Sequence, residues 1–361
     1  MFKLIAEDKA RQGIFRVNNK KIQTPFFMPV ATKAVGRYIG SLDYSELGAE
    51  AIISNSFLLS LNPGLDQIRD IHKFMNFNDI IFTDSGGFQI IRSMYIRSAE
   101  DGIIFRDPFT GREQIFSPEK VIQTQNKINS DVAMVLDDMS PFNSSKEAAV
   151  KSLKNTHAWA EVQLRLHHNK HQSLFGIIQG SFYKDLREKS AEFITSLDFG
   201  GIAVGGLAIG ESKENTKKAL SWVKPFLPEN KLRYAMGIGE INDLFYFIEN
   251  GIDCFDSVFP TQNARHNTVF TSEGKLYIDK SVYRTNQKSL DKNCGCKICR
   301  NFSRAYLNYL AKNNDPMANY YLSYHNLYFY QDLMKKIQTS IRENEFSRLK
   351  RSVLNKYQLK N

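Results

Sequence analysis

Three aspartates and one glutamine stand at the ends of short apolar runs, and their side chains could do chemistry together. Asp84 ends DIIFTD, Asp137 follows VAMVL, Gln179 follows LFGII, and Asp256 ends CFD. Two carboxyl groups that face a sugar can act as nucleophile and general acid/base. An Asp side chain accepts hydrogen bonds from adjacent N–H groups on a purine edge, while Gln both donates and accepts. These residues predict a pocket for a guanine-like base above a reactive ribose.

Glycines and an aromatic side chain could complete such a pocket. Gly205-Gly206 ends another apolar run, and without side chains its backbone groups could approach a flat ring edge-on. Phe88 could stack on the face of a base. One Asp at the end of a strand is often only a loop cap. Three of them with a Gln at one rim are harder to explain as caps.

A second group of residues has the spacing of a metal site. Cys294, Cys296 and Cys299 present three thiols within six residues, and His325 is the only histidine downstream. Three sulfurs and one nitrogen would fill the tetrahedral shell of Zn²⁺ and leave no position for a reactive water, which indicates a structural zinc. The alternative is three reduced cysteines in a core. We expect His325 at the start of a helix and Cys254 as a buried apolar residue.

Eight largely apolar runs, separated by helix-like stretches, would position the strand-end residues. Runs that are apolar on both faces are typical of buried parallel strands, and eight such strand–connection units predict an irregular (β/α)8 barrel. On a parallel barrel the carboxyl ends of the strands meet at one mouth. The runs are 26–32, 51–57, 79–87, 132–138, 174–180, 201–206, 232–239 and 254–260.

The connections and the two ends of the chain add further elements. Amphipathic stretches at 146–168, 183–197, 213–226 and 241–250 predict helices between the strands. RDPFTGREQIF predicts a hairpin around Thr110-Gly111, and the residues up to Gln23 a strand pair that closes one end. After Pro260 we expect the cysteine cluster and two helices with apolar stripes that serve as core or interface. The stripes are Phe302, Ala305, Tyr306, Tyr309 and Leu310, then Tyr330, Leu333, Met334, Ile337 and Ile341.

The positive charge of the chain is concentrated near its end. Residues 275–361 hold 17 Lys and Arg against 6 Asp and Glu, while the rest of the chain is almost neutral. A basic region of this kind suits a polyanion such as nucleic acid, although a solvated basic tail has the same composition. We find no signal peptide and no run of about 20 apolar residues that could cross a bilayer. The expectation is a cytoplasmic protein that does not enter a membrane.

Several motifs, in this order, resemble the tRNA-guanine transglycosylase family. The resemblance extends from about Gly13 to Gln338, and its strength lies in the ordered set together with the zinc signature. The motifs are DSGGFQ (84–89), VLDD (135–138), IIQGS (177–181), VGGLAIGE (204–211), MGIGE (236–240), FDSVFPTQNAR (255–265) and CxCxxC…H.

The resemblance implies a homodimeric zinc protein that exchanges a base in a tRNA anticodon without ATP. Asp256 matches the nucleophile of the family and Asp84 its general acid/base. Expected base contacts come from Asp137, Gln179, Ser85, the backbone of Gly206 and Leu207, the rings or side chains of Phe88 and Met236, and Glu211 on the substituent side. Arg265 and Gln262 match positions that contact tRNA. Zinc would be held by Cys294, Cys296, Cys299 and His325, one ion per chain.

Two departures from the family pattern affect substrate contacts. Gln262 stands where the family commonly has Arg, so an RNA contact is weakened or made by another residue. Met139 replaces a small residue two places after Asp137 and could reshape the base pocket. Ile209 is branched and should disfavour the bulky ring of queuine. We therefore expect the bacterial reaction of the queuosine pathway, with 7-aminomethyl-7-deazaguanine (preQ1) entering tRNAs that have a GUN anticodon.

The expected organisation is a barrel over residues 1–270, with an inserted hairpin near 95–120, and a zinc-binding, tRNA-contacting subdomain over 271–361 packed on it. Three alternatives stay open. The chain could be a non-catalytic partner subunit that binds tRNA, or a transglycosylase that uses queuine or another deazaguanine. It could also be a metal-dependent barrel hydrolase, although no HxH-type pair stands at any strand end.

Overall fold

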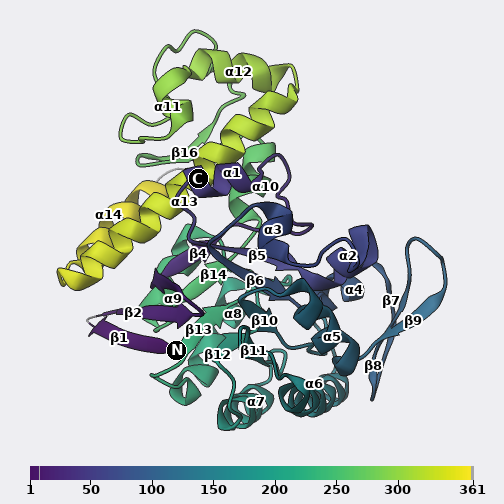
Figure 1. Cartoon of the computed structure of the whole chain (residues 1–361). Coiled ribbons are helices and arrows are strands. Elements are labelled where there is room, and N and C mark those ends of the chain that lie inside the picture. Colours follow the sequence, from purple (N-terminus) through teal and green to yellow (C-terminus); the bar gives the residue numbers. More distant parts are fainter. Residues whose placement is uncertain (8, 359–361) are drawn as a thin grey trace.

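Eight short parallel strands form the central barrel of the computed structural model, which describes residues 1–7 and 9–358 (Figure 1). The strand order is β4-β14-β13-β12-β11-β10-β6-β5, and a parallel bridge between Val30 and Ile53 joins the two ends of this sheet. The predicted fold class is confirmed, since each of the eight apolar runs coincides with one of these strands to within a residue at its start. They are β4 (Phe26–Met28), β5 (Ala51–Asn55), β6 (Ile80–Asp84), β10 (Val132–Met134), β11 (Ser173–Ile178), β12 (Gly201–Val204), β13 (Leu232–Ala235) and β14 (Cys254–Asp256).

Helices cover the outside of the barrel, and several begin at a serine whose side chain caps the first turn. Ser117, Ser145 and Ser212 each accept a backbone N–H at the start of their helix, which satisfies a donor that the first turn leaves free. The four predicted amphipathic stretches are α6 to α9. The helices are α1 (Ser41–Glu46), α2 (Ser56–Leu59), α3 (Ile71–Met75), α4 (Gly87–Ser93), α5 (Pro118–Ile128), α6 (Lys146–Leu166), α7 (Lys184–Ser196), α8 (Lys213–Val223), α9 (Ile241–Glu249) and α10 (Phe259–Arg265).

A small antiparallel sheet closes the amino end of the barrel. It has three strands, β1 (Phe2–Glu7), β2 (Arg11–Val17) and β3 (Lys20–Gln23), where the sequence led us to expect a pair. Phe15 is fully buried and its ring packs against those of Phe82 and Phe175 inside the barrel. Arg11 forms a buried ion pair with Asp253, just before β14. This end of the barrel is therefore sealed, and any site must lie at the other end.

A second antiparallel sheet follows α4. Its strands are β7 (Tyr95–Ala99), β8 (Gly102–Arg106) and β9 (Glu113–Phe116), so the β8–β9 hairpin turns around Thr110-Gly111 as predicted and β7 adds a third strand. Oδ1 of Asp107 accepts the backbone N–H groups of Phe109 and Thr110 and so holds the turn. The hydroxyl of Ser98 donates to Asp138, which ties this sheet to the loop after β10.

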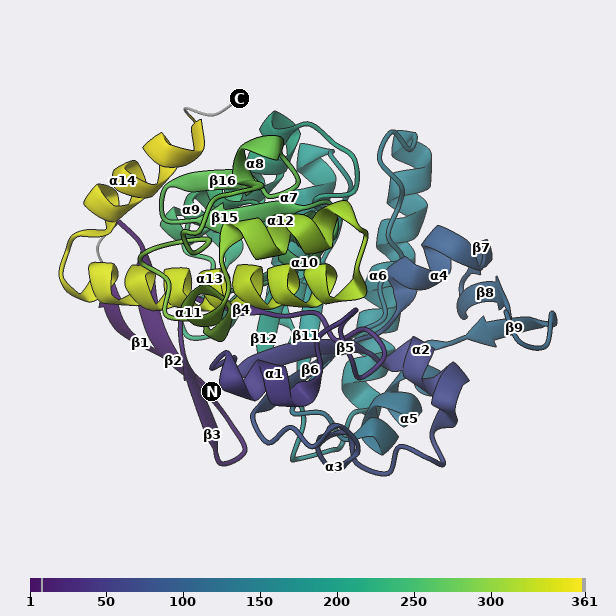
Figure 2. The same ribbon diagram turned by 90° about the horizontal axis from the view of Figure 1, so that it is seen from above.

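The chain after the barrel contains more helix than we expected. It forms β15 (Thr268–Thr271), β16 (Gly274–Tyr277), α11 (Lys297–Asn301), α12 (Arg304–Lys312), α13 (Pro316–Arg342) and α14 (Phe346–Gln358), and α12 lies beside α13 (Figures 1 and 2). The prediction of two helices was wrong. The position of His325 was also wrong, because α13 begins nine residues earlier, at Pro316, after the N-cap Asp315. His325 therefore lies inside a long helix rather than at its start.

Helix α13 links two hydrophobic cores. Its first half packs with the cysteine cluster, whereas the predicted stripe in its second half, Tyr330, Leu333, Met334, Ile337 and Ile341, is buried with the strands of the barrel. The amide of Gln331 donates to the carbonyl of Phe27 in β4. In the stripe predicted on α12, Leu310 is buried but Tyr306 and Tyr309 are 43% and 62% exposed. That face of α12 is therefore not core.

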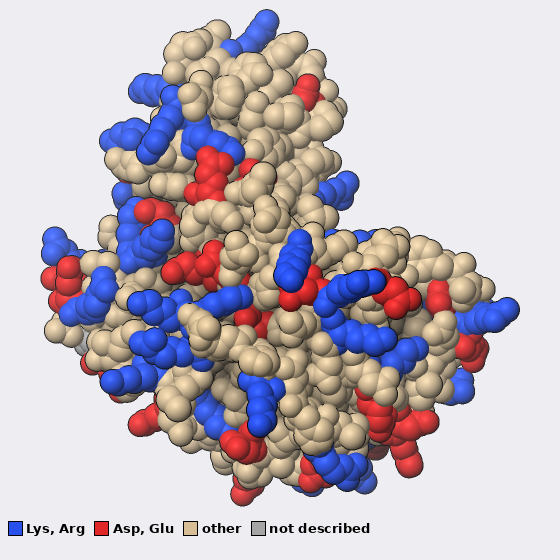
Figure 3. All heavy atoms as spheres, viewed as in Figure 1, with Lys and Arg blue, Asp and Glu red and all other residues tan. Residues whose placement is uncertain are grey.

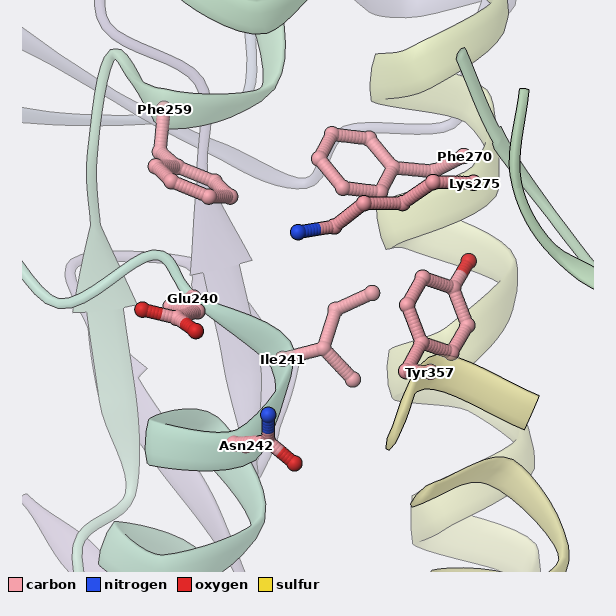
Figure 4. A pocket seen from close by; sticks show the side chains of 7 residues that line it. All are labelled: Glu240, Ile241, Asn242, Phe259, Phe270, Lys275 and Tyr357. Carbon is pink, nitrogen blue, oxygen red and sulfur yellow. The ribbon is translucent and has the colours of Figure 1, made fainter. Parts of the chain in front are cut away.

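A cavity of about 10 Å³ lies where α9, α10, β15, β16 and α14 meet (Figure 4). This volume is enough for about one water molecule. The hydroxyl of Tyr357 donates to the carbonyl of Thr271 beside it. None of the predicted site residues lines this cavity, so we regard it as a packing gap under the C-terminal helix. Its lining residues are Glu240, Ile241, Asn242, Phe259, Phe270, Lys275 and Tyr357.

Within the described residues no helix is long and apolar enough to span a bilayer.

Candidate active site

The four predicted strand-end residues lie at the same mouth of the barrel. Asp84 ends β6 and Asp256 ends β14, while Asp137 and Gln179 follow β10 and β11. All these strands are parallel, so their carboxyl ends open on one side, opposite the end that β1–β3 close. The negative charge of Asp256 is among the causes that raise the pKa of Asp84, which requires the two carboxyl groups to be near each other. The mouth thus brings together groups that are 172 residues apart in the chain.

Asp256 is held by two donors that the sequence did not single out. The hydroxyl of Tyr234 lies 2.6 Å from Oδ1 of Asp256, and the backbone N–H of Gly237 lies 2.8 Å from the same oxygen. Burial raises the pKa of Asp256, and these two hydrogen bonds work against that rise because they stabilise the ionised form. Both bonds go to Oδ1. Oδ2 is therefore the oxygen that neither donor occupies, and it could act as a nucleophile.

Asp84 has a different environment. Its Oδ1 is buried and has no hydrogen-bond partner among the described residues. Burial raises the pKa of Asp84 well above its ordinary value of 3.8, and the charges of Asp256 and Asp137 raise it further, while the backbone N–H of Gly86 lowers it in part. Burial and the two neighbouring negative charges thus favour the protonated form of Asp84. Two carboxyl groups with unlike environments are suited to unlike roles, one as proton donor and one as nucleophile.

Asp137 and Gln179 form a polar pair beside these acids. Nε2 of Gln179 donates to Oδ2 of Asp137 at 2.5 Å, and burial raises the pKa of Asp137 to about 6. The N–H of Gln179 donates to the hydroxyl of Ser190 on α7, which fixes the backbone of the glutamine. A Cβ atom on Gly205 or Gly206 would come within 2.7 Å of the Gln179 amide. The glycines are therefore needed for this close approach, and the pair can read the edge of a flat base.

The side chain of Glu211 holds the loop after β12, in which this residue lies. The carboxylate of Glu211 accepts the N–H groups of Ala208 and Ile209, at 2.7 and 2.9 Å. The side chain predicted to read the substituent of the base thus also caps this loop. In a planar trans peptide the carbonyl points away from the N–H, so the carbonyl of Leu207 points away from Glu211. This carbonyl lies toward Gly237, whose N–H donates to Asp256.

The remaining predicted base contacts have varied environments. Phe88 is 43% exposed at the start of α4, so its ring is free to stack on a ligand. Met236 is half-buried and follows β13. Ser85 is buried, and its hydroxyl accepts the N–H of Gly87 at 3.5 Å. Asp138 accepts hydrogen bonds from Ser98 and from Asn155 on α6, so it is a structural link.

The two predicted tRNA contacts lie on α10, directly after the Asp256 strand. Gln262 is exposed, whereas Arg265 is half-buried. Burial lowers the pKa of Arg265, and repulsion from the nearby Arg37 lowers it further. Two cations that repel each other provide a place where a phosphate would be favourable.

Cys294, Cys296, Cys299 and His325 converge on one point, with their ligand atoms within 4.8 Å of one another. Nδ1 of His325 lies 3.8, 3.5 and 3.3 Å from the three sulfurs, in chain order. With Zn–S about 2.3 Å and Zn–N about 2.0–2.1 Å, a tetrahedral ion would hold nitrogen and sulfur about 3.6 Å apart. The four residues therefore fit a metal ion of this type and form a possible metal site.

The other nitrogen of His325 supports the same conclusion. Nε2 lies 2.9 Å from the backbone carbonyl of Phe270, to which it would donate a proton. That tautomer leaves Nδ1 unprotonated and directed at the sulfurs, as metal-binding histidines require. Cys254, by contrast, is buried within β14 and belongs to the barrel core, as expected.

Comparison with known proteins gives one consistent family. The family model described as "Queuine tRNA-ribosyltransferase" matches residues 7–359. Proteins named "Queuine tRNA-ribosyltransferase" from Enterococcus faecalis and from Caldanaerobacter subterraneus subsp. tengcongensis are 40% and 41% identical to this chain. The first alignment covers 99% of this chain and 96% of the relative, and the second covers 98% and 95%. A protein of the same name from Fusobacterium nucleatum is 39% identical, with 98% and 96% covered.

Proposed function

The chain belongs to the queuine tRNA-ribosyltransferase family, and from this premise we propose that it exchanges the wobble guanine of GUN-anticodon tRNAs for preQ1 through a covalent aspartyl–ribose intermediate. Enzymes of this kind are pentosyltransferases that act on tRNA without ATP. The observation that carries the proposal is the contrast between Asp256 and Asp84. The carboxylate of Asp256 is held by two donors, whereas the raised pKa of Asp84 favours its protonated form at the same mouth.

In the first step, Asp256 displaces the guanine. Oδ2 of Asp256 attacks C1′ of the ribose, and the bond between C1′ and N9 breaks with its electron pair leaving on the base. The protonated carboxyl of Asp84 gives its proton to the departing base. The tRNA is then joined to Asp256 by an ester, and guanine leaves the pocket.

In the second step, the same residues act in reverse. The carboxylate of Asp84 removes the proton from N9 of the incoming base, and this nitrogen attacks C1′. The bond between C1′ and Asp256 breaks, which restores the carboxylate. Both displacements occur at one carbon, so the configuration of the ribose is retained. One glycosidic bond replaces another, which explains why no ATP is needed.

The pocket wall supports preQ1 as the incoming base. Asp137 and Gln179 would hold the edge of the base, Phe88 and Met236 would contact its faces, and the N–H groups of Gly206 and Leu207 would meet its carbonyl oxygen. The carbonyl of Leu207 offers an acceptor for the aminomethyl group of preQ1, since it points away from Glu211. The branched side chain of Ile209 disfavours the larger ring of queuine.

We further propose that the Cys3His site binds one structural Zn²⁺. Four protein ligands leave no open position, so the ion would stabilise the fold and take no part in the chemistry. It would hold α11 against α13, and α13 in turn packs on the barrel. Residues 271–361 would thus form a subdomain that the metal holds together and that α13 attaches to the barrel.

This subdomain would also contact the tRNA. Lys and Arg gather over the C-terminal helices on the left of Figure 3, with fewer Asp and Glu among them. Arg265, and Gln262 in place of the usual Arg, would extend this contact toward the mouth. We propose a homodimer as the working form, and the exposed Tyr306 and Tyr309 on α12 support an interface there.

The proposal is tested by exchange of radiolabelled guanine into purified tRNA. We expect the wild-type protein to incorporate the label and to form an enzyme–tRNA adduct that survives on a denaturing gel. Asp256→Asn should do neither. Lack of exchange by the folded wild-type protein would favour the non-catalytic subunit, and exchange by Asp256→Asn would overturn the assignment of the nucleophile. Parallel reactions with preQ1, queuine and guanine, analysed by mass spectrometry of the nucleosides, decide the incoming base.

A further inference from the structure

Arg187 on α7 is a fully buried cation next to the base pocket, and among the described residues no carboxylate is in direct contact with it. Its guanidinium donates instead to four backbone carbonyls, which lie at or just after the ends of the neighbouring strands β11 and β12. Nε lies 2.6 Å from the carbonyl of Ser181, and Nη1 lies 3.3 and 2.7 Å from those of Ile178 and Gly205. Nη2 lies 3.0 Å from the carbonyl of Gly206. A buried arginine requires such bonds, because an unpaired charge in the interior is very costly.

Two of these carbonyls belong to the peptide units that would contact the base. The carbonyl of Gly205 shares its peptide plane with the N–H of Gly206, and the carbonyl of Gly206 shares its plane with the N–H of Leu207. In a trans peptide the two groups point in opposite directions. Because Arg187 binds both carbonyls, both N–H groups point away from the guanidinium. Neither N–H has a hydrogen-bond partner within the part of the chain that the structure describes.

The backbone that Arg187 holds is in an unfavourable conformation. Ser181 and Ala208 have φ of 51° and 56°, which is rare for residues with a side chain, and Gly180 and Gly206 also have positive φ. Such conformations persist only where the surrounding contacts impose them. Arg187 binds the carbonyls of Ser181 and Gly206 directly. The same cation therefore fixes the turn that follows Gln179 and the turn that precedes the Glu211 loop.

We propose that Arg187 is the positioning residue of the base pocket: it orients and polarises the N–H groups of Gly206 and Leu207 as a pair of donors for the carbonyl oxygen of the base. This inference rests on the proposed function and deepens it. When the bond between C1′ and N9 breaks, the base takes up negative charge that spreads to this oxygen. Preorganised N–H donors stabilise such charge without rearrangement, and the guanidinium behind them adds a positive potential.

Arg233 provides a matched control, because it is also a buried arginine that donates to backbone carbonyls. Its partners are the carbonyls of Leu227, Pro228 and Gly251. It lies near the amino end of β13, away from the mouth where the base would bind. Lysine at either position retains the charge but loses the planar fork that binds several carbonyls at once. Arg187→Lys and Arg233→Lys should therefore both lower stability, but only the first should disturb the base pocket.

The test is the KM for guanine and the KM for tRNA in the exchange reaction, measured for the full-length wild-type protein and both variants. KM does not depend on the fraction of protein that is active, so partial unfolding does not affect it. For Arg187→Lys we expect the KM for guanine to rise about tenfold or more, because two N–H donors to the base oxygen are misplaced together, with the KM for tRNA unchanged. For Arg233→Lys we expect a lower melting temperature and an unchanged KM for guanine.

An unchanged KM for guanine in Arg187→Lys, an equal rise for guanine and tRNA, or the same rise in Arg233→Lys would each overturn the inference. If Arg187→Lys does not fold, Arg187→Gln is measured instead, because it retains amide donors without a buried charge, and the same rise is expected. A wild-type protein without exchange activity would be a different result. It would refute the proposed function, and this inference with it.

Discussion

The hydroxyl of Tyr234 donates a 2.6 Å hydrogen bond to Oδ1 of Asp256 from within the barrel core. Tyr234 is fully buried in β13, and its ring makes an edge contact with that of Phe82. The neighbouring strand β14 carries Asp256, and the two strands pair in register just before the acid. A residue that looks like core packing therefore also sets how readily the proposed nucleophile ionises.

Tyr234→Phe should slow the exchange reaction mainly near and below neutral pH. Loss of the donor removes a bond that favours the carboxylate, so the pKa of Asp256 should rise further and less of it is ionised. A hydrogen bond to a charged group contributes about 1.5–3 kcal/mol, which corresponds to at least about a tenfold loss of rate. Activity should recover in part as the pH is raised. A loss of rate that is the same at every pH would indicate a different role for Tyr234.

The barrel could be predicted from the sequence because parallel strands buried on both faces are continuous apolar runs. The strand-end acids were predictable for the same reason, since an Asp directly after such a run breaks the pattern. The cysteine spacing predicted the possible metal site without knowledge of the fold. His325 was identified only as the one histidine downstream. Its place in α13 could have been predicted from Asp315-Pro316, which is a typical N-cap and first helical residue.

Other features had no distinct pattern. Tyr234 lies in an apolar strand, where its hydroxyl is not distinguishable from those of other core tyrosines. The N–H of Gly237 is a backbone group and has no sequence signal at all. Arg187 occurs in the charged stretch KDLREKS, which is typical of an exposed helix face. Helix α14 was missed because its basic residues resemble a solvated tail, although Leu349 and Val353 pack on the core.

Asp84→Asn should stabilise the protein at neutral pH while it abolishes exchange. The folded-state pKa of Asp84 is raised, so the stability that this group contributes is present at low pH and lost as the pH rises above the ordinary value of 3.8 toward the folded value. Asparagine cannot ionise, so the variant does not lose stability in this way as the pH rises. We expect a gain of about 0.5–2 kcal/mol at pH 7, as is common when a functional group is removed, and a smaller gain below about pH 4. Thermal melting at several pH values measures it.

Asp138→Asn is the control for this stability effect. Asp138 is also buried, but its carboxylate accepts hydrogen bonds from Ser98 and Asn155. An amide cannot accept with its nitrogen, so this variant should be less stable than the wild-type protein. If Asp84→Asn lowered the stability at pH 7 as much as Asp138→Asn does, the inference that the unpaired carboxyl group of Asp84 destabilises the protein would be wrong.

Removal of the metal should loosen the zinc subdomain more than the barrel. We expect one zinc per chain by elemental analysis, and chelation should expose α11 and α12 to proteolysis because their core is built around the cysteines. The second half of α13 should remain protected, since it packs with the barrel strands. Restored zinc should restore protection. Cleavage within the barrel strands at the same rate as in α12 would contradict this division.

Affinity for tRNA should fall steeply with salt. Contacts between cations and phosphates release counterions, so the dissociation constant should rise about tenfold or more between 50 and 200 mM salt. In a plot of the logarithm of the affinity against the logarithm of the salt concentration, the slope for Arg265→Gln should be less steep by about one unit. Arg165→Gln, which changes an exposed cation on α6, should leave the slope unchanged. Equal slopes for the wild-type protein and Arg265→Gln would exclude Arg265 from the RNA contact.

Tyr306 and Tyr309 should hold two copies of the chain together. They are three residues apart on α12, so their side chains lie on the same face of the helix, and both are largely exposed. Exposed aromatic residues are typical of the central part of an interface, where each can contribute about 2 kcal/mol or more. Tyr309→Glu should therefore shift the protein toward a monomer in analytical ultracentrifugation without lowering its melting temperature. The control is Phe74→Glu, which changes another exposed aromatic residue, on α3. If both variants sediment like the wild-type protein, the dimer must form through a surface other than α12, because a charge buried without a partner at the proposed contact could not be accommodated.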